Sequence, residues 1–133
     1  MNVQPESVRA ATVYIVDDDA MVRRALARLL RAAGHEVETF PSAGAFLARD
    51  PAPQTGLLLL DVCMPGMSGP ELQERLLENG STLPVHFMSA LDDAHVRERV
   101  LAAGACAWFT KPVDGDALLA VLAGNRRANR SAG

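Results

Sequence analysis

Leu57-Leu58-Leu59-Leu60-Asp61 is the stretch of sequence that decides the fold. Four consecutive leucines predict a strand in the middle of a parallel sheet, because helices cover both faces of such a strand and neither face needs polar residues. The run ends in a carboxylate, and residues 62–67 (Val-Cys-Met-Pro-Gly-Met) follow as a loop. Residues 68–71 (Ser-Gly-Pro-Glu) then predict a capping box that begins a helix, which runs to about Asn79 and is closed by Gly80.

The chain before this strand shows the same order of strand and helix. Residues 12–16 (Thr-Val-Tyr-Ile-Val) form a short apolar run that predicts a buried strand, and three aspartates, 17–19, end it. Ala20 to Ala33 has apolar residues at helical spacing with arginines opposite, and the last of the three aspartates, Asp19, is the expected N-cap. Val37 to Phe40 can form a second strand, and a short helix capped by Ser42 follows.

Two more units follow the central strand. Val85 to Met88 predicts a fourth strand ending at Ser89, and Ala105 to Thr110 predicts a fifth ending at Lys111. The helices after them are expected to begin at Asp92 or Asp93 and at Asp114, to stop at Gly104 in the first case, and to use Leu118 and Leu122 in the second. Five such units predict an α/β fold of three layers, a doubly wound (βα)5 arrangement with a parallel sheet. The pattern alone does not give the strand order.

Length and composition indicate one domain. A chain of 133 residues that is 49% hydrophobic fits a single core. We expect a flexible leader over residues 1–11, the domain over 12–124, and a polar basic tail or linker stub over 125–133. The sequence leaves open whether the tail ends a single-domain protein or begins a linker to a DNA-binding domain.

Charge and cysteine content exclude several classes of protein. The net charge of −3 and the pI near 5.5 argue against direct nucleic-acid binding. Two cysteines are too few for a disulfide scaffold, so reduced thiols are expected. There is no signal-peptide pattern and no apolar stretch of roughly 18 residues, which predicts a cytoplasmic protein with no membrane association.

Polar side chains follow the carboxyl ends of four predicted strands, and these ends share one edge of an open parallel sheet, where ligands bind. Three clustered carboxylates repel one another, and Mg²⁺ with oxygen ligands, together with a lysine, would balance them. This combination suits phosphoryl transfer with an aspartate as the nucleophile. The residues are Asp17, Asp18, Asp61, Ser89 and Lys111.

Each of these residues also has an ordinary structural interpretation. Aspartate after a strand is most often a turn residue or a helix cap, Ser89 can be a cap, and Lys111 can be a solvated surface group. Their common position at strand ends is what favours a site. The three histidines, His35, His86 and His95, lie on separate elements and are expected to be surface or strand residues, not phosphoacceptors.

Four segments together resemble the response-regulator receiver family of two-component signalling. They are Val-Asp-Asp-Asp at 16–19, Leu-Leu-Asp-Val-Cys-Met-Pro-Gly-Met-Ser-Gly at 59–69, Ser89-Ala90 and Lys111-Pro112. The resemblance covers nearly the whole chain and implies a flavodoxin-like sheet of order 2-1-3-4-5. Residues 40–47 are similar to receivers of the FixJ-like group of transcriptional regulators.

The resemblance implies a role for each site residue. Asp61 matches the phosphoacceptor, Asp18 a direct Mg²⁺ ligand, Asp17 an acidic partner that holds the ion chiefly through water, and Cys63 a ligand through its backbone carbonyl. Ser89 matches the hydroxyl that turns to the phosphoryl group, and Lys111 the ammonium that pairs with Asp61 and then with phosphate. A cis peptide at Lys111-Pro112 is also implied.

Two positions depart from the usual family pattern. Trp108 stands where the family often has Tyr or Phe that turns inward when Ser89 moves, and simple packing on the sheet is the alternative for it. Cys63 stands where the family tunes dephosphorylation, and the sequence does not give a phosphoryl lifetime.

The resemblance implies a signalling domain and not an enzyme, apart from self-catalysed phosphotransfer and dephosphorylation. The implied partners are a sensor histidine kinase or phosphotransfer protein, and a second copy in a phosphorylation-dependent homodimer formed through the fourth helix, fifth strand and fifth helix. One alternative is a Mg²⁺-dependent phosphatase like the haloacid-dehalogenase-like hydrolases, which need an aspartate where Cys63 stands. The other is a non-phosphorylated binding module, and the intact set of five site residues argues against it.

Overall fold

The structure is a computed structural model that describes residues 12–132, with side chains as far as residue 124. It contains a five-stranded parallel sheet of order β2-β1-β3-β4-β5, which confirms the expected order 2-1-3-4-5. The strands are β1 (Val13–Val16), β2 (Val37–Phe40), β3 (Leu57–Asp61), β4 (Val85–Ser89) and β5 (Ala107–Thr110). The leucine run therefore forms the central strand, as predicted.

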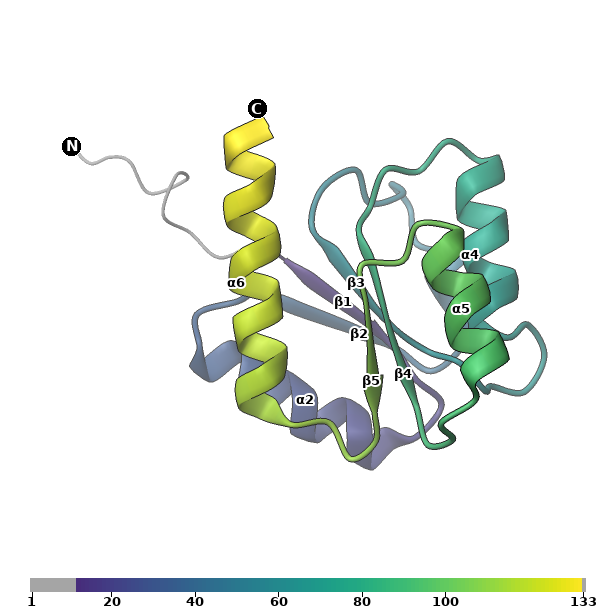
Figure 1. Cartoon of the computed structure of the whole chain (residues 1–133), viewed down its shortest axis with the longest axis horizontal. Coiled ribbons are helices and arrows are strands. Elements are labelled where there is room, and N and C mark those ends of the chain that lie inside the picture. The colour runs from purple at the N-terminus through teal and green to yellow at the C-terminus, as the bar shows by residue number, and fades with distance from the viewer. Residues whose placement is uncertain (1–11, 133) are drawn as a thin grey trace.

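Helices cover both faces of the sheet (Figure 1). On one face lie α2 (Ala20–Ala32) and α6 (Gly115–Ala132), and on the other lie α3 (Ala43–Leu47), α4 (Gly69–Glu78) and α5 (Ala94–Ala102). The four leucines of β3 are at most 2% exposed and alternate between the two cores, Leu58 and Leu60 on the α4 side and Leu57 and Leu59 on the α2 side. Burial of each stabilises the fold by about 1.5–3 kcal/mol. This is the doubly wound, three-layer α/β fold that the sequence predicts.

The predicted helix boundaries are confirmed by their caps. The side chains of Asp19, Ser42, Ser68 and Asp93 accept hydrogen bonds from the first turns of α2, α3, α4 and α5, so Asp93 and not Asp92 caps α5. Three helices end in the same glycine motif: Gly34, Gly80 and Gly104 have positive φ, and the next residue donates back to the helix. Only glycine adopts this backbone without strain.

One boundary differs from the expected one, and one helix end was not predicted. The fifth strand begins at Ala107 instead of Ala105, because the Ala105 N–H closes the last turn of α5 by donating to the Val100 carbonyl at 2.9 Å. Helix α6 continues to Ala132, and so includes most of residues 125–133. The domain boundary at 124 stays a prediction, and the predicted leader lies outside the described residues. None of the helices described is long and apolar enough to cross a membrane.

Candidate functional site

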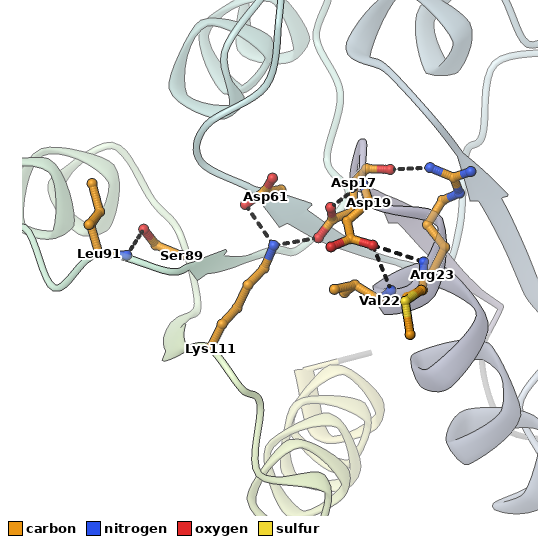
Figure 2. A network of polar contacts seen from close by, with 9 residues as sticks. Asp17, Asp19, Val22, Arg23, Asp61, Ser89, Leu91 and Lys111 are labelled. Carbon is orange, nitrogen blue, oxygen red and sulfur yellow. Dashed lines mark hydrogen bonds and ion pairs between the residues drawn. The ribbon is translucent and has the colours of Figure 1, made fainter.

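A lysine joins two aspartates at the carboxyl edge of the sheet. Asp17 follows β1, Asp61 ends the neighbouring strand β3, and Lys111 follows β5. The Lys111 Nζ atom lies 2.7 Å from Asp17 Oδ2 and 3.2 Å from Asp61 Oδ1 (Figure 2). The structure thus brings together three residues that are far apart in sequence, and it places the ammonium nearer to Asp17 than to the expected partner, Asp61.

The acidic residues form a compact cluster. One carboxylate oxygen from each of Asp17, Asp18 and Asp61 lies within 4.8 Å of those of the other two. Asp17 and Asp61 are buried, whereas Asp18 is exposed. The cluster is therefore open to solvent on the Asp18 side and partly dehydrated beneath it.

Burial and neighbouring charges shift the pKa values of Asp61 and Lys111. Burial, with the charge of Asp17 adding to it and the Lys111 ammonium opposing it, raises the pKa of Asp61 to about 6. Burial alone would lower the pKa of Lys111, but its hydrogen bond to Asp17 and the Asp61 charge raise that pKa overall. Lys111 consequently stays cationic, and one ammonium does not compensate three carboxylates.

The cluster fits a hard divalent cation. Asp17 Oδ1 accepts the Asp19 N–H at 2.8 Å, and the buried Asp17 Oδ2 lies 2.7 Å from the Lys111 ammonium, the one donor near it among the described residues. A buried carboxylate oxygen without a full set of donors is costly, and Mg²⁺ is a partner for several such oxygens at once. Asp17, Asp18 and Asp61 are the residues that would hold it.

The turn after β1 is fixed by two contacts, of which the sequence predicted one. Asp19 is the N-cap of α2, as expected, and its carboxylate accepts the N–H groups of Met21 and Val22. The Arg23 guanidinium donates to the Asp17 carbonyl at 2.7 Å (Figure 2), and this contact was not predicted. Its only sequence signal is its place one turn into the helix, which does not distinguish it from its neighbour Arg24.

Ser89 ends β4 at the same edge, but its hydroxyl is turned to the loop beyond it. Ser89 Oγ accepts the Leu91 N–H at 3.1 Å (Figure 2). Among the described residues it makes no hydrogen bond to the acidic cluster. The sequence therefore places Ser89 at the site correctly but does not give the direction of its hydroxyl.

The two positions that depart from the family pattern have different surroundings. Trp108 is half-buried on β5 and stacks on Phe87 with ring centroids 6.5 Å apart, and its buried Nε1 has no hydrogen-bond partner among the residues that the structure describes. Trp108 is therefore packed on the sheet in this structure, and its turning when Ser89 moves stays a prediction. Cys63 is exposed on the loop after Asp61.

One histidine has an environment that the sequence does not reveal. His86 is fully buried in β4, with Nδ1 3.4 Å from the Leu58 carbonyl and no partner for Nε2 within the described part of the chain. Burial lowers its pKa. As expected, it is a strand residue.

Comparison with known proteins places this site in a family. Residues 13–123 match the family model of the response regulator receiver domain. The chain is 41% identical to the response regulator protein TodT of Pseudomonas putida, over 87% of this chain and 51% of TodT. It is 36% identical to the transcriptional regulatory protein FixJ of Bradyrhizobium diazoefficiens, over 83% of this chain and 54% of FixJ. The chain thus spans about half the length of these curated relatives.

The solved structures agree with the observed topology. A CheY-like response regulator receiver domain protein from Methanospirillum hungatei JF-1 superimposes with a TM-score of 0.85 at 27% identity, over 93% of this chain and 99% of that one. The fold is therefore flavodoxin-like. The chain belongs to the response regulator receiver domain family of two-component systems, and its relatives include FixJ. Receiver domains bind Mg²⁺ at a cluster of acidic residues such as the one described above.

Proposed function

We propose that this chain is a phosphorylation switch in which Asp61 accepts a phosphoryl group from a sensor histidine kinase or a phosphotransfer protein. The observation that carries the proposal is the Lys111 ammonium held between Asp17 and Asp61 within a cluster of three carboxylates. This arrangement presents an acceptor carboxylate, a fixed cation and metal-ligating oxygens at one sheet edge. The predicted cytoplasmic location stays part of the proposal.

Each residue of the site has a different role in the phosphoryl transfer. An Asp61 oxygen forms the new bond to phosphorus while the bond from phosphorus to the donor breaks, and the donor leaves with that electron pair. A pKa of about 6 leaves Asp61 mostly ionised at neutral pH and therefore able to attack. Mg²⁺ held by Asp17, Asp18, Asp61 and the Cys63 carbonyl would supply positive charge to the phosphoryl oxygens. Lys111 supplies a second cation from the protein itself.

The output of the switch begins at Ser89. The Ser89 hydroxyl oxygen accepts a hydrogen bond from the Leu91 N–H at 3.1 Å. On phosphorylation the hydroxyl would give up this hydrogen bond and donate one to a phosphoryl oxygen. The loop between β4 and α5 then loses a hydrogen bond, and the population of conformations at the surface of α5, β5 and α6 shifts. Trp108 is the aromatic residue of this surface that we expect to respond, and phosphorylation-dependent pairing of two copies through the surface is the expected consequence.

A small phosphodonor tests the acceptor without knowledge of the kinase. Incubation with acetyl phosphate and Mg²⁺ should add one phosphoryl group, which mass spectrometry detects and alkali removes. Asp61→Asn should stay unlabelled, because the amide is not a nucleophile. Asp93→Asn is the matched control, since Asp93 caps α5 outside the cluster, and it should be labelled like the natural chain. Equal labelling of Asp61→Asn would refute the assignment.

A further inference from the structure

The first residue of α4 lies against the backbone of the acceptor. Gly69 directly follows the N-cap Ser68, is buried, and donates its N–H to the Val62 carbonyl at 2.9 Å. Its φ is not positive, so any residue could adopt its backbone conformation. The requirement for glycine at this position is therefore one of space.

A side chain at residue 69 would collide with Asp61. A Cβ added there would lie well inside the van der Waals contact distance of the Asp61 carbonyl oxygen and 3.1 Å from the Asp61 carbonyl carbon. These are backbone atoms, which cannot rotate away as the end of a side chain can. The strand end is also held from the other side, where the Val62 N–H donates to Met88 in β4 at 2.9 Å. Either α4 or the backbone of Asp61 must move.

A side chain at residue 69 would also contact the aromatic pair formed by Phe87 and Trp108 through the Phe87 ring. The added Cβ would lie 3.1 Å from Cε1 of Phe87, whose ring stacks on Trp108. Gly69 thus borders the acceptor backbone and Phe87, the ring on which Trp108 stacks.

We propose that Gly69 is a positioning residue for the acceptor: its lack of a side chain lets α4 rest on the Asp61 backbone and so fixes the Asp61 carboxylate relative to Asp17 and Lys111. The Lys111 Nζ to Asp61 Oδ1 distance of 3.2 Å leaves little freedom for such a shift. The inference rests on the proposed function in that Asp61 is taken as the acceptor.

The test compares Gly69→Ala with Gly44→Ala. Both glycines lie in the first turn of a helix, but a Cβ on Gly44 meets only Ser42 Oγ, at an ordinary 3.9 Å. We expect Gly69→Ala to weaken Mg²⁺ binding and to slow labelling by acetyl phosphate by about tenfold or more each, because small displacements of reacting groups have large effects. Gly44→Ala should change neither by more than about twofold. A Mg²⁺ titration followed by NMR and the time course of labelling give these values.

A second comparison separates positioning from loss of stability. Leu122→Ala removes a buried side chain on the opposite face of the sheet and should lower the unfolding temperature without changing the Mg²⁺ dissociation constant. Gly69→Ala and Leu122→Ala are also measured in a stabilising osmolyte, which restores folding but not geometry. Unchanged Mg²⁺ binding in folded Gly69→Ala, an equal loss in Leu122→Ala, or failure of Gly69→Ala to fold with osmolyte would each overturn the proposal.

A third readout does not depend on phosphorylation. The NMR amide signals of residues 61–63 and the indole N–H signal of Trp108 should move in Gly69→Ala and stay in place in Gly44→Ala. If the natural chain is not labelled by acetyl phosphate but these signals move, the proposed function fails and the positioning role stands. If labelling occurs and the signals do not move, the positioning role fails alone.

Discussion

At the scale of single residues, the acidic site and His86 illustrate opposite ways of burying a titratable group. Asp61 is buried beside a cation and keeps a pKa of about 6, so both its charged and neutral forms are accessible near neutral pH. His86 is buried with no charged partner among the side chains described, and only its neutral form suits the core. The first group is suited to chemistry, and the second is expected to affect stability.

His86 should make the fold sensitive to acid. Burial lowers its pKa from the ordinary 6.5, so the unfolded chain binds the proton more readily than the folded one. The stability that neutral His86 allows is present above about pH 6.5 and is lost as pH falls below it, by at most about 1.4 kcal/mol per pH unit for one proton. The free energy of unfolding, measured with urea at several pH values from about 7.5 down to 5.5, should fall more in the natural protein than in His86→Leu. Parallel curves for the two proteins would contradict this.

At the scale of elements, helix α4 begins where the loop after Asp61 ends, and its cap holds that loop. Ser68 Oγ accepts the Glu71 N–H at 3.2 Å, and Glu71 Oε1 accepts the Ser68 N–H at 2.8 Å. This bond to the Ser68 backbone lowers the pKa of Glu71. The capping box therefore fixes the point at which residues 62–67 enter the helix.

Removing this cap should loosen the loop beside the acceptor. Ser68→Ala is expected to cost about 1 kcal/mol of unfolding free energy, the usual value for an N-cap. Ser42→Ala, which uncaps α3, should cost a similar amount. Hydrogen exchange distinguishes the two, because only Ser68→Ala should speed exchange of the amides in residues 62–67. Equal protection of that loop in both variants would show that the cap does not hold it.

The sequence predicted these elements well because their signals are local. The leucine run, the capping residues and the glycines that close helices each act within a few residues, and each was confirmed. The start of β5 was missed because the Ala105 N–H bonds back to α5. The Lys111–Asp17 contact and the space at Gly69 depend on residues brought together by the fold, so no local pattern could indicate them. The Ser89 hydroxyl is turned by a local contact with the Leu91 N–H, but serine can make such a turn or point elsewhere, so the sequence does not give its direction.

At the scale of the whole molecule, the order of the strands in the sheet brings the site residues together. Strands β1 and β3 are neighbours in the centre of the sheet, and their ends place Asp17 beside Asp61. The alternation of strands and helices predicted a common edge, but the order that makes these two strands adjacent came from the family resemblance. The fold therefore carries a concentration of negative charge that it must tolerate when no cation is bound.

Mg²⁺ should consequently stabilise the entire fold through Asp18. Asp18→Asn removes one of three mutually repelling carboxylates, so without Mg²⁺ the variant should unfold at a slightly higher urea concentration than the natural protein. With Mg²⁺ at about 100 times its dissociation constant, the natural protein should gain about 2.7 kcal/mol, because the ion binds the folded state alone. The Asp18→Asn variant should gain almost no stability from Mg²⁺.

The control is Asp92→Asn, which removes an exposed carboxylate paired with Arg97 outside the cluster. Mg²⁺ should stabilise it as much as it stabilises the natural protein. Loss of stability in Asp18→Asn both with and without Mg²⁺ would mean that Asp18 supports the fold in another way and that repulsion is not the dominant effect.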